Sequence, residues 1–183
     1  FTNSADALDI KKIRGWFSTN YYNWTRERNY RFLNPKVIVE PLLFPGCPCD
    51  DYKVFCLNGK AKFLKIEIDR AGTHQHAVYT PDWQRVPVQF STNRSQSSQK
   101  EVKRPPNLQR ILSIAEELGR DFSFIRVDFY TNGDDIYVGE LTNVPGDTRS
   151  VFGSHQEEEI IKSILFSNGG IKKELVEKGI VNT

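Results

Sequence analysis

The dipeptide Asn58-Gly59 is the feature of this sequence that most restricts its fold. It separates two segments, YKVFCL and KAKFLKIEID, in which apolar and polar residues alternate. Asn-Gly readily adopts the positive φ angles of a two-residue hairpin turn, and alternation with a period of two is typical of strands. The two segments therefore predict a β-hairpin over residues 52–69.

Further segments also predict strands. FSFIRVDFY and IYVGELT flank the turn sequence NGDD and predict a second hairpin. HAVYT predicts a short strand, and residues 83–90 predict another. Residues 37–44 form an apolar run rich in β-branched residues that is broken by prolines and a glycine, which predicts a buried strand that stops early.

Helical periodicity marks the segments between and after these strands. Residues 4–18 begin with a serine and an acidic first turn, and they predict a first helix. NLQRILSIAEELG has one apolar face and a terminal glycine, which predicts an amphipathic helix. Residues 155–166 and 171–178 predict two more. Because hairpins rather than strand-helix-strand crossovers dominate, the predicted fold class is α+β, an antiparallel sheet with flanking helices.

Length and composition limit the classes of protein that this chain can belong to. The 183 residues predict a single domain, and the polar, aperiodic residues 91–104 predict a mobile surface loop within it. No apolar run is long enough for a membrane span, and a net charge of +2 is too small for nucleic-acid binding through bulk charge. The three cysteines, at positions 47, 49 and 56, are a poor disulfide framework and favour a reducing, cytoplasmic compartment.

Two carboxylates stand well up the second predicted hairpin. Asp128 lies in FIRVDFY and Glu140 in IYVGELT, so cross-strand pairing brings them together if they share a face. Two like charges at that distance need a cation, and hard oxygen ligands with room for water and phosphate oxygens favour Mg²⁺. The alternative is a pair of strand carboxylates bound by Arg126 or by lysine.

Several short motifs follow one another in a specific order. VIVEPLL, DYKVFCLNGKAKFLKIEIDR and NLQRILSIAEELGRDFSFIRVDFY precede Glu140-Leu-Thr-Asn-Val-Pro-Gly146. This order resembles the ATP-grasp enzymes, whose metal-binding end follows such a hairpin. NYYNWTRERNY, the DYKVFCLNGK stretch and GELT are similar to the TupA-like branch, which is associated with teichuronopeptide and surface-polysaccharide synthesis. The resemblance covers about residues 20–150 and implies an ATP-grasp-like C-terminal portion.

The resemblance implies roles for residues at the nucleotide. Glu40 and the backbone of Leu42 and Leu43 are expected at the adenine, because a hinge backbone offers one N–H and one C=O to the base. Lys53 and Arg70 are expected as catalytic residues that stabilise the negative charge of a transferring phosphoryl group. The alternative for each is an ordinary ion pair or surface charge.

The resemblance also implies the cofactors, ATP and Mg²⁺. Asp128, Glu140 and Thr142 are the expected metal ligands. Thr142 stands where the common family pattern has asparagine, with Asn143 one step later, and a hydroxyl is a poorer metal ligand than an amide oxygen. The family supplies phosphate-binding lysines and a Gly-rich loop from a segment before this region, which has no counterpart among residues 1–183.

The expected function is therefore that of an ATP-dependent carboxylate-amine ligase, with a nucleotide and a carboxylate- or sugar-containing acceptor as partners. The alternative is a non-catalytic nucleotide- or sugar-binding module of a polysaccharide assembly protein.

Two weaker hypotheses concern other residues. Cys47, Cys49, Cys56, His74 and His76 include soft ligands for zinc, although C-x-C is not the usual spacing. The aromatic and basic residues 21–31 are able to stack on bases or sugars, although such residues are more often core.

Overall fold

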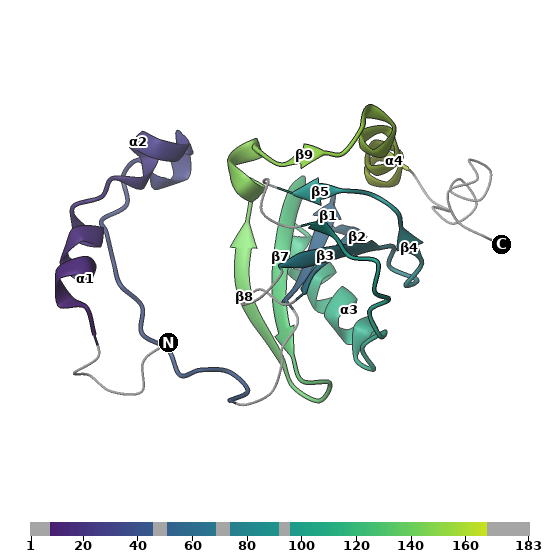
Figure 1. Ribbon diagram of the computed structural model, residues 1–183, viewed down its shortest axis with the longest axis horizontal. Helices are drawn as coiled ribbons and strands as arrows, with labels where there is room; N and C mark the ends of the chain where they lie inside the picture. The colour runs from purple at the N-terminus through teal and green to yellow at the C-terminus, as the bar shows by residue number, and fades with distance from the viewer. Residues whose placement is uncertain (1–7, 46–50, 69–73, 92–95, 168–183) are drawn as a thin grey trace. The chain divides into compact units, whose positions relative to one another are not determined.

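The computed structural model describes residues 8–45, 51–68, 74–91 and 96–167. The chain divides into two compact units, Phe1–Cys47 and Pro48–Thr183. We call them the N-terminal unit and the sheet unit and describe each by itself (Figure 1).

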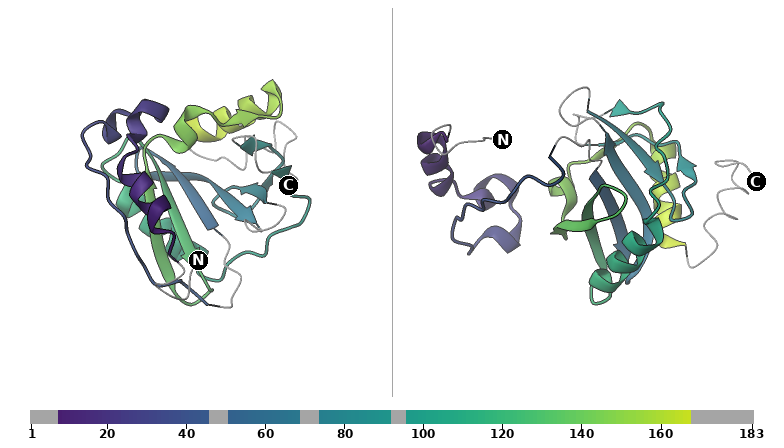
Figure 2. Two further views of the ribbon diagram at one scale, coloured as in Figure 1. Left: turned by 60° about the vertical axis from the view of Figure 1, so that its left-hand side comes forward. Right: turned by 90° about the horizontal axis from the view of Figure 1, so that it is seen from below.

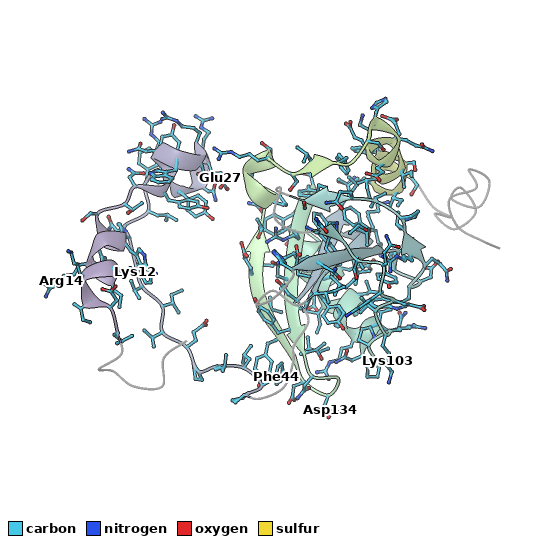
Figure 3. The ribbon with its side chains drawn as sticks, viewed as in Figure 1. Lys12, Arg14, Glu27, Phe44, Lys103 and Asp134 are labelled. Carbon is cyan, nitrogen blue, oxygen red and sulfur yellow. The ribbon has the colours of Figure 1, made fainter. Side chains whose placement is uncertain are left out.

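The N-terminal unit consists of short helices. They are α1 (Ile10–Phe17), α2 (Tyr21–Thr25) and the 3-10 helix η2 (Arg28–Tyr30). The carboxylate of Asp9 caps α1 by accepting a hydrogen bond from the backbone N–H of Lys12 at 2.9 Å. None of the residues of these helices is buried, and the side chains of Lys12 and Arg14 stand out from α1 in Figure 3. The first predicted helix is confirmed for residues 10–17, whereas Leu8 and Asp9, which the prediction included, lie before its first turn.

The predicted strand at residues 37–44 is wrong. Residues 33–42 form neither helix nor strand, and the side chains of Ile38 and Val39 are 79% and 89% exposed. A strand needs a neighbour that pairs with its backbone N–H and C=O groups. The described part of the N-terminal unit contains no strand that could serve as this neighbour, so β-branched composition alone does not produce one.

The sheet unit is built around a seven-stranded sheet with the order β4-β3-β2-β1-β7-β8, to which β6 is added beside β3. All neighbours pair antiparallel except β3 and β6. Both predicted hairpins and the α+β class are thereby confirmed. The strands are β1 (Asp51–Leu57), β2 (Lys60–Ile68), β3 (Gln75–Tyr79), β4 (Arg85–Val86), β6 (Gln96–Ser97), β7 (Phe124–Thr131) and β8 (Ile136–Thr142).

Turn chemistry explains how both hairpins close. Asn58 and Gly59 have φ angles of 49° and 71°, which is the pair of positive values that a type I′ turn requires. In the β7–β8 turn, the side-chain oxygen of Asn132 accepts hydrogen bonds from the backbone N–H of Asp134 at 3.0 Å and of Asp135 at 2.8 Å. Asp134 marks this turn in Figure 3.

One face of the sheet packs against α3 (Leu108–Gly119), as its amphipathic sequence predicts. The larger hydrophobic core lies on this face. Every second residue of the central strands points toward α3. Figures 1 and 2 show α3 and α4 on opposite sides of the sheet. The strand residues of this core are Tyr52, Val54, Cys56, Leu64, Ile66, Ala77, Tyr79, Ile125, Val127 and Phe129.

The opposite face is divided into an apolar and a polar part. In the apolar part, Phe55 stacks on Phe63 with 4.3 Å between ring centroids, and both pack against α4 (His155–Phe166). Beside this cluster lies a two-stranded sheet of β5 (Phe90–Ser91) and β9 (Val151–Phe152). The 3-10 helix η3 (Pro145–Thr148) lies between β8 and β9 in the chain. The polar part is described below, and the two parts meet where the ammonium of Lys65 lies 5.6 Å from the ring centroid of Phe90.

The segment expected as a mobile surface loop is partly built into the fold. Residues 92–95 lie outside the described residues, but Ser98 and Val102 are buried. The N–H of Val102 donates to the hydroxyl of Tyr79 at 2.9 Å, and its carbonyl accepts from the indole of Trp83 at 3.2 Å. The expected helix at residues 171–178 also lies outside the described residues. None of the described helices has the length and apolar character that a membrane crossing requires.

Candidate functional site

Four adjacent strands carry polar residues on the same face. The residues at alternate positions of β2, β1 and β7 point away from α3, since their sequence neighbours form the core on the α3 side, and Glu140 of β8 joins them through its pairing with Asp128. In register, Lys65 lies opposite Lys53, Lys53 opposite Asp128, and Asp128 opposite Glu140. A row of charged residues thus crosses the sheet; we call it the polar row.

The two candidate metal carboxylates end this row. Asp128 and Glu140 are directly paired across β7 and β8, so they share one face of one antiparallel sheet. The Asp128 side chain is 3% exposed and the Glu140 side chain 54%, so the pair reaches from the interior of the unit to solvent. The shared face that the sequence predicts is therefore present.

Arg126 connects the two carboxylates. Its Nε donates to Asp128 Oδ1 at 2.6 Å and its Nη2 to Asp128 Oδ2 at 2.8 Å, a two-pronged contact that fits a guanidinium to a carboxylate. The same Nη2 lies 3.3 Å from Glu140 Oε2. One cationic nitrogen thus contacts both acids, which is the alternative arrangement of two strand carboxylates bound by Arg126.

Lys53 brings a second positive charge to Asp128. Its ammonium lies 2.5 Å from Asp128 Oδ2 and 2.8 Å from Asp51 Oδ2. Asp51 and Lys53 occupy alternate positions of β1, so both side chains point to the polar face. Lys53 thus contacts one of the two candidate metal carboxylates, and its catalytic role stays a prediction.

Thr142 lies beside Glu140 at the outer edge of the site. Its hydroxyl donates to Glu140 Oε1 at 2.7 Å and accepts from Arg126 Nη2 at 3.0 Å. The hydroxyl oxygen therefore sits within the same hydrogen-bonded group as both carboxylates. Its part as a metal ligand stays a prediction.

The remaining predicted site residues are not part of this group in the described structure. Glu40, Leu42 and Leu43 belong to the N-terminal unit and are exposed. Arg70 lies outside the described residues. Contact of these four residues with a nucleotide stays a prediction.

The alternative zinc reading finds no support in the described residues. Cys47 and Cys49 lie outside them, and among the described residues no three or more His, Cys, Asp and Glu side chains gather as metal ligands. Cys56 belongs to the core on the α3 side, where burial and, to a lesser extent, Glu116 raise the pKa of its thiol to about 12. A thiol that holds its proton so firmly is a poor metal ligand.

Sequence reasoning did not assign a role in the site to Asp51, Lys65 or Glu67, and it considered Arg126 only as an ion-pair partner. The signal was present as a repeated spacing. Asp51-Tyr-Lys53, Lys65-Ile-Glu67, Arg126-Val-Asp128 and Glu140-Leu-Thr142 each place two polar residues on one face of a strand, with an apolar residue between them.

The antiparallel sheet with its flanking helices is consistent with an ATP-grasp-like fold. A family model described as TupA-like ATPgrasp matches residues 2–165. The chain belongs to the TupA-like ATP-grasp family. Comparison with the curated proteins and with the solved structures gave no match.

The donor set fits the Mg²⁺ that the family implies. Asp128, Glu140 and Thr142 offer only oxygen atoms, and Arg126 Nη2 already lies within hydrogen-bond distance of an oxygen of each. Mg²⁺ prefers oxygen ligands and commonly keeps several waters and substrate phosphates beside one or two carboxylates. A site with two carboxylates and an exposed side matches that preference.

Proposed function

We propose that the protein is an ATP-dependent carboxylate-amine ligase. The observation that supports this proposal most directly is the pairing of Asp128 with Glu140 on one face, beside the cations Arg126 and Lys53. Family membership supports an ATP-dependent, ligase-like reaction. Phosphoryl transfer depends on positioning and on stabilising negative charge more than on a protein nucleophile, and these four side chains provide for both needs.

The reaction has two steps. In the first, a carboxylate oxygen of the acceptor attacks the terminal phosphorus of ATP, and the bond to the departing ADP breaks. In the second, an amine attacks the acyl carbon, phosphate leaves, and the amine loses a proton. Both steps build up negative charge on phosphate oxygens, which cations beside the site stabilise.

Particular residues take particular parts in these steps. Asp128, Glu140 and Thr142 would hold Mg²⁺, which would supply positive charge that stabilises the phosphates. Lys53 orients Asp128 through its ion pair, and Lys53 and Arg126 add positive charge next to the phosphates. Glu40, Leu42 and Leu43 contact the adenine, and Arg70 adds a further positive charge.

The biological setting belongs to the same proposal. The acceptor is a carboxylate- or sugar-containing molecule used to build a cell-surface polysaccharide or peptide polymer, as the resemblance to the TupA-like branch implies. The reaction takes place in the cytoplasm, where ATP is supplied and where crowded cysteines stay reduced. Nucleic acid is not a partner, given the nearly balanced charge of the chain.

A second candidate function is nucleotide or sugar binding without catalysis. The observation that favours it is that both carboxylate oxygens of Asp128 are already bound, one by Arg126 and the other by Arg126 and Lys53. A carboxylate held in this way also suits a purely structural ion-pair network. The two functions differ in one measurable property, the release of ADP.

The test uses Asp128→Asn and Glu140→Gln, which remove charge and keep the size of each side chain. Both variants should lower Mg²⁺-dependent ADP release from ATP on the order of a hundredfold or more, because the phosphates lose their metal. Melting temperatures, measured in parallel, report whether the variants fold. Asp134→Asn is the matched control, because Asp134 is an exposed acid in the turn of the same hairpin, and this variant should release ADP at the wild-type rate.

Each result has a definite meaning. Turnover at the wild-type rate in both folded site variants would contradict the metal assignment. Tight nucleotide binding by the wild type with no ADP release, in the presence of candidate carboxylates and amines, would favour the binding module.

A further inference from the structure

A cavity of about 470 Å³ lies on the α3 side of the sheet unit. Residues of α3, the start of β2, the turn between β3 and β4 and the segment before α3 line it. Sites for small molecules commonly have volumes of roughly 300–1,000 Å³, so this cavity is large enough for a ligand. The polar row points away from α3, so the cavity is separate from the candidate metal site.

Two opposite charges line this cavity without pairing. Arg104 precedes α3, and Asp82 lies in the turn between β3 and β4; Lys103, the residue before Arg104, is labelled in Figure 3. Arg104 and Asp82 form no ion pair with each other, and neither has a hydrogen bond or an ion pair with another residue in the described part of the chain. Both are exposed, so water solvates them when the cavity is empty, and both charges are available to a ligand.

The helix α3 contributes neutral polar groups and an apolar surface. Gln109 and Ser113 are four residues apart, so they lie on one face of α3, and neither is hydrogen-bonded to a residue that the structure describes. An amide and a hydroxyl each offer both a donor and an acceptor. Leu112 lies between them and belongs to the core, and its apolar atoms strengthen nearby charge contacts by lowering the local dielectric constant.

The second carboxylate of the cavity already has partners. Glu116 Oε1 accepts a hydrogen bond from the N–H of Ala61 at 3.2 Å, and Glu116 Oε2 lies 3.0 Å from Lys60 Nζ. Among the residues that line the cavity, Asp82 is therefore the carboxylate best able to bind a cation, and Arg104 is the cation able to bind an anion.

We propose that this cavity binds a small zwitterion, an amino acid or a short peptide, whose carboxylate is held by Arg104 and whose ammonium is held by Asp82. A guanidinium donates two parallel hydrogen bonds to a carboxylate, and an ammonium donates to a carboxylate. A simple anion or cation would pair with only one of the two charges, and a neutral sugar with neither. Gln109 and Ser113 bind further polar atoms of the ligand, and an aliphatic side chain packs on Leu112. This inference goes beyond the proposed reaction and does not rest on it.

The test titrates the full chain with L-leucine and with L-alanyl-L-leucine, and follows the backbone amide resonances by NMR. These two probes distinguish an amino acid from a peptide as the ligand. At least one of them should bind saturably and shift the resonances of Asp82 and of Gln109, Leu112 and Ser113. Resonance shifts that saturate but lie elsewhere in the chain would overturn the inference.

Removing each charge from the protein and from the ligand then shows which groups meet. Arg104→Gln and Asp82→Asn should each lower the affinity for the probe about tenfold, as expected for the loss of a charge-assisted contact. The C-terminal amide of the probe lacks the carboxylate, so it should bind the wild type and the Arg104 variant equally. The N-acetylated probe lacks the ammonium, so it should bind the wild type and the Asp82 variant equally.

Matched controls exist on and beside the same helix. Arg110 lies on α3 and Asp121 follows it, and both are exposed and do not line the cavity. Arg110→Gln and Asp121→Asn remove the same kinds of charge and should bind the probe as the wild type does. Melting temperatures of all four variants report whether they fold.

The outcomes decide the inference independently of the ligase proposal. If neither probe binds the wild type, the charges of the cavity are only solvated surface charges and the inference is overturned. Equal affinity in the wild type and in the folded Arg104 and Asp82 variants also overturns it, as does an equal loss in the control variants. ADP release plays no part in these measurements, so a failure of the proposed function leaves them unaffected.

Discussion

Successive residues of a strand point to opposite faces of the sheet, and His76 shows how its position changes the pKa of a titratable side chain. His76 is fully buried, and its Nε2 accepts a hydrogen bond from the backbone N–H of Phe90 at 3.2 Å. The pKa of His76 is lowered to about 4, and burial is the largest cause. The positive charge of Lys65 also lowers this pKa, and the negative charge of Glu67 raises it by less. The neutral imidazole thus anchors β5 over the sheet.

The stability of the fold should depend on pH through His76. The unfolded chain takes up a proton near the ordinary pKa of 6.5, whereas the folded chain resists it until about pH 4. The free energy of unfolding should therefore be constant above about pH 6.5 and fall as the pH is lowered to about 4. The contribution of this group is at most about 3 kcal/mol.

Urea denaturation at several pH values between 7.5 and 4 measures this effect. His76→Gln keeps an acceptor for the N–H of Phe90 but does not titrate, so its stability should change less over the same range. Carboxylates that titrate below pH 5 contribute equally to the unfolding free energies of both proteins, so their contribution cancels when the two are subtracted. Parallel curves for the wild type and the variant would show that His76 is not the group responsible.

At the scale of elements, the hairpin of β7 and β8 depends on an irregularity. Asp128 pairs with Glu140 but Phe129 pairs with Val138, so Gly139 is the extra residue of a β-bulge. A Cβ atom at Gly139 would lie 2.6 Å from a ring carbon of Tyr130, which is too close for two carbons. The absence of a side chain at Gly139 thus lets the strand place Glu140 beside Asp128.

Gly139→Ala should consequently disturb both the strand pair and the site. The Tyr130 ring or the bulge must shift, and overpacking of this kind costs about 1–3 kcal/mol of unfolding free energy. Affinity for Mg·ATP should fall as well, since Glu140 is the next residue. Urea denaturation and calorimetry measure the two effects.

Gly15→Ala is the control for this experiment. A Cβ at Gly15 would meet nothing within 4 Å, and alanine favours the helix in which Gly15 lies. This substitution should leave the affinity for Mg·ATP unchanged. An equal loss of affinity in both variants would mean that the bulge has no special part in the site.

The elements also show what the sequence was able to predict. The hairpins and α3 follow from Asn-Gly and from hydrophobic periodicity, which are local signals. The bulge at Gly139 and the missing strand at residues 37–44 depend on what lies opposite each segment, and sequence periodicity does not contain that information. The pairing of Asp128 with Glu140 could be predicted because the two residues flank one recognisable turn. The position of Lys65 opposite Lys53 depends instead on the register of β1 with β2.

At the scale of the whole molecule, the two units differ in how they are stabilised. Both described hydrophobic clusters lie in the sheet unit, one on each side of the sheet. The described helices of the N-terminal unit bury no residue. A unit with its own core is able to fold alone.

A fragment of residues 48–183 should therefore fold without the rest of the chain. Thermal unfolding should be cooperative, with a melting temperature within a few degrees of the value for the sheet in the full chain. Circular dichroism in the near ultraviolet is a suitable measurement, because Phe55, Phe63 and Tyr79 are packed in the cores. A broad, non-cooperative transition would show instead that the sheet needs residues 1–47.

The alternation of charged and apolar residues along the central strands also affects the accuracy of folding. If β2 paired with β1 one residue out of register, Lys65 and Glu67 would turn toward α3, and Leu64 and Ile66 would leave the core. Each charge misplaced in that apolar layer would cost several kcal/mol, so misregistered sheets are rejected during assembly. The charged residues Lys65 and Glu67 therefore also favour the observed register of β2 with β1.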